Sequence, residues 1–247
     1  MLVVKLGGSV ITRRGSSYAY DGASVARLGA ALADAPQPLV LVHGMGSVGR
    51  AYLPLYDGRR LRDRGAAYAL QREFLALHHQ VLSDLEDAGL PVSSVGSESV
   101  FTHHDGVVVD SSLGMVATLC AQGRVPVLQG GTFRDLHGGF AVLSSDEIAE
   151  ELVRKLQARA LMWVTDVDGV LRHGPGEVMP VLRAENRHEM LKADYDVNDL
   201  TGGMSNKVEV SLRLAVTGRA SYVVNGRAPE RVRALVRGEE AVCTVIR

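Results

Sequence analysis

Short apolar segments without polar alternation recur along the 247 residues of the chain. They occupy residues 2–6, 39–43, 91–95, 125–129, 160–167 and 221–225. Because valine and leucine fill successive positions, both faces of each segment must be buried, as they are in the strands of a parallel sheet. Helical patterns separate these segments, so the sequence predicts an α/β protein: a three-layer αβα sandwich with a mostly parallel central sheet.

Three amphipathic patterns predict helices between the strands. In residues 66–88 the apolar positions recur every three or four residues, and Gly89 follows as a stop signal. Ser144 precedes Glu147 by three residues, which is the spacing of a capping box at the start of a second helix. A third apolar stripe covers residues 204–215.

The overall composition indicates an ordinary globular protein. The chain has 27 basic and 28 acidic residues, so no global field predicts a nucleic-acid or anionic-membrane partner. No apolar run approaches the roughly 18 residues of a membrane span, and the N-terminal segment is unlike a signal peptide. Two cysteines are too few for a disulfide framework. We therefore expect one cytoplasmic domain over residues 1–247 with a small-molecule substrate.

Glycine-rich loops follow three of the predicted strands. They are "KLGGS" with Gly7 and Gly8, "HGMGSVG" with Gly44, Gly46 and Gly49, and "LQGGT" with Gly130 and Gly131. In a parallel sheet the carboxyl ends of the strands meet at the edge where ligands bind. Glycine lets a phosphate approach backbone N–H groups closely. Each loop alone is more readily a tight turn, but three at one edge predict a site for an extended anionic ligand.

Two lysines and one acid complete a pattern that suits phosphoryl transfer. Lys5 lies within the first predicted strand, where a charge is unfavourable unless it emerges at the ligand edge. Lys207 follows a glycine turn, and Asp146 begins a predicted helix. Asp146 alone is an ordinary first-turn acid. Together the three predict a clamp that positions and neutralises a transferring phosphate.

Two other nucleotide motifs fit less well. Residues 44–49 spell G-x-G-x-x-G after a strand, the dinucleotide fingerprint of oxidoreductases. The acid expected about 20 residues later, Asp63, falls in a basic stretch, and Pro54 interrupts the expected helix. A nicotinamide enzyme therefore ranks below a kinase. The absence of G-x-x-x-x-G-K-[ST] excludes a P-loop protein.

Adjacent histidines and an arginine run do not predict further sites. In His78–His79 and His103–His104 neighbouring side chains point in different directions, and no third ligand is spaced to join them, so we expect no metal site. The arginines of residues 59–64 are typical of a solvated helix face. The alternative is that they line the pocket, which would require an acceptor with more negative charge.

The motifs "VVKLGGSVIT", "VHGMGSVGR", "LSSDEIAEEL", "TDVDGV" and "DLTGGMSNKVE", in this order, resemble the amino acid kinase superfamily over essentially the whole chain. Within it the chain is most similar to the isopentenyl phosphate kinases, with fosfomycin kinases as close relatives. The resemblance implies the amino acid kinase fold, a homodimer, and use of ATP with a magnesium ion. It implies acceptor binding by the N-terminal part of the domain and ATP binding by the C-terminal part.

The resemblance also assigns roles to individual residues. Lys5 and Lys207 would contact the transferring phosphate, and Asp146 would orient them. The nucleotide would be held by Gly7, Gly8, Ser9, Thr165, Asp166, Asp168, Gly169, Thr201, Gly202 and Gly203. The acceptor would be held by Arg14, Gly44, Met45, Gly46, Arg50, Gly130 and Gly131. No acid stands out as a metal ligand, which fits a magnesium ion held mainly by phosphates and water.

The chain departs from these relatives at Arg50. Their acceptor loop ends "GGGSFGH" or similar, with a histidine that binds the acceptor's phosphate or phosphonate, whereas this loop ends "GSVGR". Arginine is always charged and offers a planar fork to an anion, unless it turns outward with the neighbouring arginines. We expect a small acidic acceptor, foremost a phosphate monoester such as isopentenyl phosphate, which would become its diphosphate. A phosphonate or carboxylate acceptor, or a non-catalytic nucleotide- or metabolite-binding protein, remains the alternative.

Overall fold

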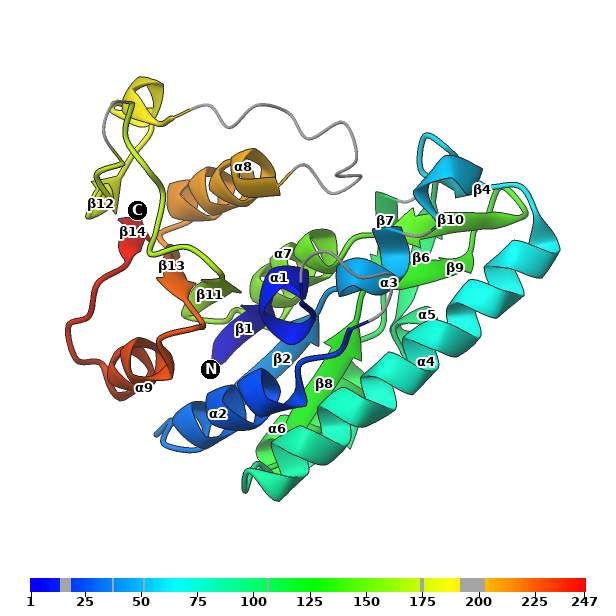
Figure 1. Ribbon diagram of the computed structural model, residues 1–247, viewed down its shortest axis with the longest axis horizontal. Coiled ribbons are helices and arrows are strands. Elements are labelled where there is room, and N and C mark those ends of the chain that lie inside the picture. Colours follow the sequence, from blue (N-terminus) through cyan, green and yellow to red (C-terminus); the bar gives the residue numbers. More distant parts are fainter. Residues whose placement is uncertain (14–18, 37, 51, 106, 174–175, 192–202) are drawn as a thin grey trace.

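An eight-stranded sheet forms the centre of the computed structural model (Figure 1). The structure describes residues 1–13, 19–36, 38–50, 52–105, 107–173, 176–191 and 203–247. Of residues 50 and 53 it describes only the backbone. In spatial order the strands are β12 (Val181–Leu182), β14 (Thr244–Ile246), β13 (Ala220–Asn225), β11 (Ala160–Thr165), β1 (Leu2–Leu6), β2 (Leu39–His43), β8 (Val125–Gln129) and β5 (Val92–Ser94). Only β13 and β14 pair in antiparallel fashion, so the predicted mostly parallel sheet is confirmed.

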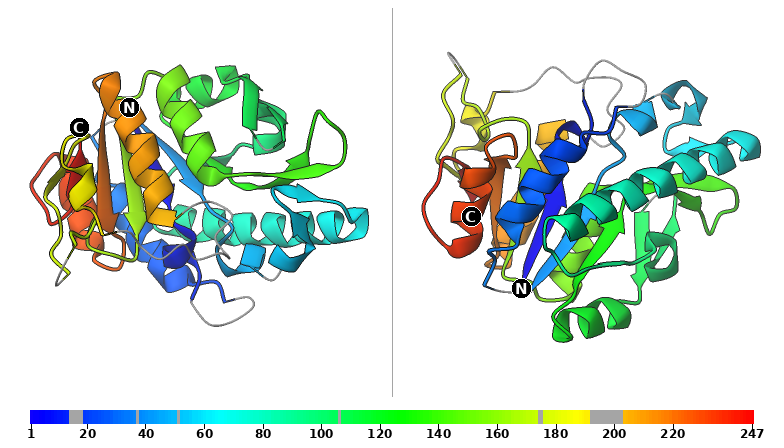
Figure 2. Two further views of the ribbon diagram at one scale, coloured as in Figure 1. Left: turned by 90° about the horizontal axis from the view of Figure 1, so that it is seen from above. Right: turned by 60° about the horizontal axis from the view of Figure 1, so that its bottom comes forward.

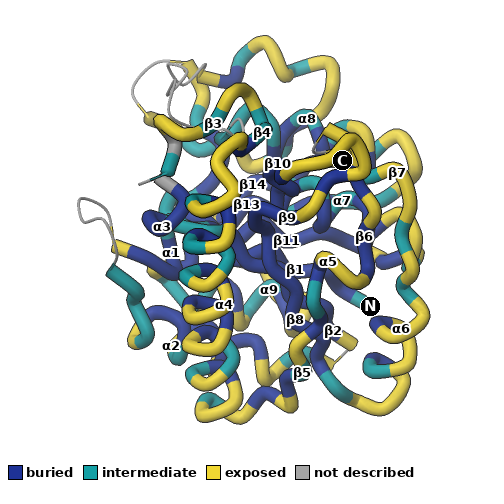
Figure 3. Tube along the Cα trace, turned by 90° about the vertical axis from the view of Figure 1, so that its right-hand side faces the viewer, coloured by how far each residue is buried: buried dark blue, intermediate teal, exposed yellow. Residues whose placement is uncertain are grey.

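Helices cover both faces of this sheet and complete the predicted three layers (Figure 2). One face carries α2 (Gly22–Leu32), α4 (Arg64–Asp87) and α9 (Pro229–Arg237), and the other carries α6 (Gly114–Ala121), α7 (Ser145–Lys155) and α8 (Gly203–Val216). Alternate residues of one strand enter different cores, since Val4 packs with the first helical layer and Val3 with the second. Figure 3 shows the resulting burial of the central strands on both sides.

The connections that the structure describes contain three short α-helices and two 3₁₀ helices. The α-helices are α1 (Gly8–Ile11), α3 (Gly46–Arg50) and α5 (Ser97–Val100), and the 3₁₀ helices are η1 (Leu53–Leu55) and η2 (Arg187–Glu189). The three predicted helices correspond to α4, α7 and α8. The described residues contain no helix with the length and apolar character that a membrane crossing requires.

The helix start at Ser144 is confirmed, but the predicted capping box is wrong in its second half. Ser144 Oγ accepts a hydrogen bond from the N–H of Asp146 at 3.2 Å. Glu147 does not return to the cap, because its Oε1 binds Arg59 NH1 at 2.5 Å. The side chain that the spacing assigns to a local cap therefore makes a contact across 88 residues of sequence.

The described part of the chain also forms two smaller sheets that the sequence does not predict. Strands β3 (Tyr56–Asp57), β4 (Arg60–Leu61), β10 (Phe140–Leu143) and β9 (Gly131–Arg134) form one, and β6 (Phe101–His104) pairs with β7 (Val107–Ser111) in the other. The prediction of a solvated helix face for the arginine run is wrong for Arg59 and Arg60. Both lie in the β3–β4 hairpin, where Arg60 forms an ion pair with Asp105.

A chain of hydrogen bonds through two buried histidines ties the end of β2 to α4 and β5. His43 Nδ1 lies 3.0 Å from Gly44 O, His43 Nε2 lies 2.8 Å from His78 Nδ1, and His78 Nε2 lies 2.9 Å from Ser94 Oγ. All three bonds form at once when both imidazoles are neutral and each donates from Nδ1. Burial lowers the pKa of His43 to about 4 and that of His78 to about 3, where the neighbouring histidine adds to the shift.

We expect this histidine pair to make the fold sensitive to acid. In the unfolded chain a histidine binds a proton near pH 6.5, so between pH 6.5 and about 4 the unfolded state binds more protons than the folded state. The stabilisation is therefore complete above pH 6.5 and is lost as the pH falls towards 4, by roughly 3 kcal/mol for His43. Urea unfolding at several pH values between 7 and about 4.5 measures this loss.

A matched pair of variants on α4 tests whether the histidine pair is responsible. His78→Gln should flatten the dependence of the unfolding free energy on pH, because one of the two buried imidazoles is gone. His79→Gln, which changes the exposed neighbour, should keep the wild-type dependence. Parallel curves for wild type and both variants would show that other groups cause the acid sensitivity.

Candidate active site

Three charged side chains that are distant in sequence meet inside the fold. Lys5 comes from β1, Asp146 from the first turn of α7 and Lys207 from α8. Lys5 Nζ lies 3.0 Å from Asp146 Oδ1, and Lys207 Nζ lies 2.9 Å from Asp146 Oδ2. The exposed fractions of the three side chains are 7%, 1% and 11% in chain order. The structure thus brings together the three residues that the sequence predicts as a clamp.

Strand alternation and an indole ring place the two ammonium groups. Lys5 shares with Val3 the strand face that packs against α7 and α8, since the two residues are two positions apart. Lys207 Nζ lies 5.7 Å from the centroid of the Trp163 ring, within cation–π range. The indole is itself fixed, because Trp163 Nε1 donates to Ser211 Oγ at 2.8 Å.

The cluster keeps its carboxylate ionised. Burial, the largest single influence, raises the pKa of Asp146, but the charges and hydrogen bonds of Lys207 and Lys5 together outweigh burial and lower the pKa to about 2. Two ammonium groups and one carboxylate leave one positive charge in a buried place. Each ammonium has three N–H donors, so both lysines can hold Asp146 and still donate to an anion.

The glycine loops that follow β1 and β2 touch each other beside this cluster. A Cβ on Gly8 would lie 2.6 Å from Gly46 Cα, and a Cβ on Gly46, whose φ is +57°, would lie 2.5 Å from the Thr12 side chain. Thr12 Oγ1 donates to Gly8 O at 2.8 Å and accepts from Ser47 N at 3.0 Å. Thr12 therefore fastens the two loops together, a role that the glycine pattern does not reveal.

The loop after β8 closes the same space. A Cβ on Gly130 would lie 2.7 Å from the backbone N of Ser145, the first residue of α7. A Cβ on Gly44 would lie 3.4 Å from Ser145 Oγ and from Gly8 N. Gly131 differs, because a Cβ there would meet the Phe133 and Phe74 rings instead. The ends of β1, β2 and β8 thus converge on the start of α7.

The "GGS" loop offers only part of its backbone to a ligand. Gly7 N–H donates to Val164 O at 2.8 Å and so belongs to the sheet, which leaves this N–H engaged within the protein. Within the described residues, the N–H groups of Gly8 and Ser9 donate to no protein acceptor. These two groups are the ones that can face an anion.

The turn that follows β11 is held in shape by its own side chains. Asp168 Oδ1 accepts from Asn225 Nδ2 at 2.8 Å and from Arg231 NH1 at 2.6 Å, and both bonds lower the pKa of this carboxyl. A Cβ on Gly169 would lie 2.5 Å from Thr244 Oγ1, so only glycine fits there. Asp168 and Gly169 therefore determine the path of the chain beside the candidate site.

The other predicted nucleotide and acceptor residues are only partly described. Thr165 Oγ1 donates to Val167 O at 3.1 Å within the same turn, and Asp166 is half-buried next to it. Gly203 begins α8, and its carbonyl accepts from Lys207 Nζ at 3.3 Å. Met45 is half-buried in the acceptor loop. Outside the described residues lie Arg14, Thr201, Gly202 and the side chain of Arg50.

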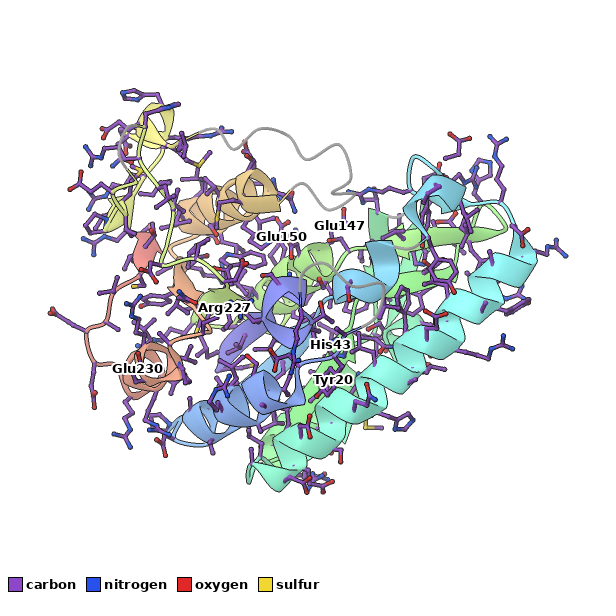
Figure 4. The ribbon with its side chains drawn as sticks, viewed as in Figure 1. Tyr20, His43, Glu147, Glu150, Arg227 and Glu230 are labelled. Atoms are coloured by element: carbon purple, nitrogen blue, oxygen red, sulfur yellow. The ribbon has the colours of Figure 1, made fainter. Side chains whose placement is uncertain are left out.

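Three polar side chains lie near the site without a role there that the sequence predicts. Ser47 Oγ is buried and has no hydrogen-bond partner among the described residues. Glu147 lies on α7 (Figure 4). Arg227 lies beside α1, where its NH2 donates to Ser9 O at 3.2 Å. Ser47 belongs to the loop "GMGSVG", and Arg227 follows the end of β13. Position at the ligand edge of the sheet is the signal that could have identified them.

Known proteins resemble this chain over its full length. The model of the amino acid kinase family matches residues 1–225. The chain is 29% identical to the isopentenyl phosphate kinase of Methanothermobacter thermautotrophicus, over 97% of this chain and 96% of that protein. It is 30% identical to the isopentenyl phosphate kinase of Haloferax volcanii, over 100% of this chain and 98% of that protein. An isopentenyl phosphate kinase crystal structure superposes with a TM-score of 0.84 at 25% identity, covering 100% of this chain and 99% of the other. The chain therefore belongs to the amino acid kinase family and is an ATP-dependent phosphotransferase.

Proposed function

We propose that the protein transfers the γ-phosphoryl group of ATP to an oxygen of a small phosphate monoester, with isopentenyl phosphate as the first candidate. The acceptor oxygen forms the new bond to the γ-phosphorus, and the bond from the γ-phosphorus to the β–γ bridging oxygen breaks, which releases ADP. The observation that carries this proposal is the buried cluster of Lys5, Asp146 and Lys207 beside the touching glycine loops.

The cluster supports transfer through charge and position. Lys5 and Lys207 neutralise the negative charge that spreads over the oxygens of the transferring phosphoryl group. Asp146 fixes the two ammonium groups, and both of its oxygens face them, so it acts as a positioning residue. An ionised phosphate oxygen is already a nucleophile, and the proposed reaction therefore needs no general base.

The loops divide the two substrates between them. The N–H groups of Gly8 and Ser9 donate to the phosphates of ATP, whose nucleoside lies along residues 165–169 and the start of α8. The acceptor's acidic group is held by residues 44–46, by Gly130 and by Arg50. The Ser47 hydroxyl, which has no partner among the described residues, is available to the same group. A magnesium ion fits as a partner of the ATP phosphates and water, because both Asp146 oxygens already face ammonium groups.

The identity of the acceptor depends on Arg50. The relatives named isopentenyl phosphate kinase favour a phosphate monoester. An arginine fork and backbone N–H groups also suit a phosphonate or a carboxylate, which is the second candidate class. Two arginines of the β3–β4 hairpin are each paired with a carboxylate, Arg59 with Glu147 and Arg60 with Asp105, so an acceptor with a single acidic group suffices.

We further propose a cytoplasmic homodimer. Val107 and Val109 on β7 and Met115 on α6 are large apolar side chains that are more than half exposed, and a second copy of the chain would cover such a surface. Cys120 and Cys243 are buried and free, which suits a reducing compartment. Sedimentation velocity should give twice the chain mass, and a monomer at working concentrations would contradict the assembly.

Removing either lysine should abolish most turnover. Lys5→Ala or Lys207→Ala should lower kcat at least about a hundredfold, because each removes a preorganised charge from the transferring phosphate. Lys155→Ala is the matched control, since Lys155 is an exposed lysine on α7, with 55% of its side chain accessible. ADP release measures the rate, and a thermal melt identifies variants that fold. Near-normal rates in folded Lys5 and Lys207 variants would exclude this mechanism.

Arg50 should set the affinity for the acceptor. Arg50→Ala should raise the acceptor KM and leave the KM of ATP unchanged, at a loss of roughly 1.5 to 3 kcal/mol for a charge-assisted contact. Arg50→His should increase activity towards isopentenyl phosphate if the contact made by its relatives is all that is missing. Arg62→Ala, on an exposed residue paired with Asp57, is the control.

A screen for ADP release over phosphate, phosphonate and carboxylate acceptors selects the substrate for these measurements. If Arg50→Ala leaves the acceptor kinetics unchanged, Arg50 faces solvent and the glycine loops alone hold the acceptor. Activity on a carboxylate with none on phosphate monoesters would replace the first candidate class with the second.

A further inference from the structure

The turns between β6 and β7 and between β9 and β10 bring His104, Asp105 and His137 together. His104 Nε2 lies 3.2 Å from His137 Nδ1, and Asp105 Oδ2 lies 3.8 Å from the same nitrogen. One ligand atom from each residue lies within 4.8 Å of the others, and about half of each side chain is exposed. We propose that these three side chains bind a divalent transition-metal ion, with zinc as the best match.

Reasoning from sequence alone missed this cluster. Adjacent His103 and His104 do point apart, since His103 is buried and His104 is exposed, as expected for neighbours in a strand. No third ligand is spaced near them in the sequence. The fold supplies it from another hairpin, because His137 lies 33 residues after His104.

The spacing and chemistry of the donors suit zinc. With Zn–N distances of 2.0–2.1 Å, two ligand atoms of a tetrahedral ion lie about 3.3 Å apart. The two imidazole nitrogens at 3.2 Å already satisfy this distance, and the Asp105 oxygen must move about half an ångström closer to His137 Nδ1. Asp105 Oδ2 lies 3.7 Å from His104 Nδ1, the nitrogen that does not face His137, so the His104 side chain must also turn for one of its nitrogens to reach a shared ion. Two imidazoles and one carboxylate form a donor set typical of zinc sites that keep a fourth position for water.

A buried histidine–aspartate pair holds the two turns against each other. His103 Nδ1 lies 3.1 Å from Asp135 Oδ2, and the two side chains are 1% and 0% exposed. Asp135 Oδ1 accepts from His137 N at 2.9 Å, and Leu136 N–H donates to His103 O at 3.1 Å. These bonds fix the backbone on both sides of the cluster without using its ligand atoms. Metal binding would therefore order side chains and leave the backbone in place.

Arg60 orients the Asp105 carboxylate, and its charge repels a cation bound at the site. Its Nε lies 3.2 Å from Asp105 Oδ1, which leaves Oδ2 for the histidines. Its positive charge disfavours a bound cation, although solvent reaches the arginine and its carboxylate partner and weakens the repulsion. Without a metal, the contact between His104 and His137 is a hydrogen bond. Binding measurements distinguish that arrangement from a metal site.

Titration of the whole protein with metal tests the proposal. Protein freed of metal with a chelator, and without nucleotide, is titrated with zinc chloride by calorimetry and with cobalt chloride by visible absorption. We expect one tight ion per chain, visible bands of tetrahedral cobalt, and a higher melting temperature with zinc. His104→Gln and His137→Gln should each weaken zinc binding at least about a hundredfold, since loss of a supporting contact alone costs 10–100-fold.

His79→Gln, which changes an exposed histidine on α4, should keep the wild-type affinity. Wild-type protein that binds no zinc, or wild-type affinity in both cluster variants, overturns the proposal. Melting temperatures measured in chelator show whether each variant folds, and Asp105→Asn provides a third test if one histidine variant does not. Because no nucleotide is present, the result is independent of whether the proposed acceptor is correct.

Discussion

The Asp146 carboxylate lies between two ammonium groups, and all three are removed from solvent. A buried ammonium is strongly unfavourable without a partner, and two of them close together also repel each other. Neither lysine could occupy its place without this one carboxylate. Lys5 is near the start of the chain and Lys207 near its end. Pairing them with Asp146 therefore requires β1 and two helices of one layer, α7 and α8, to be assembled, which links the integrity of the site to that of the fold.

The central sheet was predictable because strands buried on both faces are apolar at successive positions. Residues of β1 enter two different cores in turn, so the strand is apolar throughout apart from Lys5. The small sheets show no such pattern. Strand β4 is two residues long and pairs with β10, where Leu61 faces Phe140. Residues so far apart in the sequence pair only in the assembled fold, and no local periodicity predicts the pairing.

Site residues, too, were predictable only where the local sequence is unusual. A lysine inside an apolar strand and an acid at a helix start are unusual for local reasons, so the clamp could be predicted. The hydrogen bond between Thr12 and Ser47 and the contact between His104 and His137 form only when separate loops meet in the fold. Even within "GGS" the sequence could not distinguish a glycine whose N–H joins the sheet, Gly7, from one whose N–H donates to no acceptor among the described residues, Gly8.

The contact between Gly8 and Gly46 also bears on how a chain of this kind can diversify. A side chain on either residue would overlap the facing loop, so the separation of the two loops is set by bare backbone. Under the proposed function, variation that alters acceptor preference is thereby confined to positions beside the contact, such as residue 50. A lineage would then exchange one acceptor for another there while the path of the transferred group stays the same. Promiscuity and divergence would then begin at the end of the loop and leave its glycines untouched.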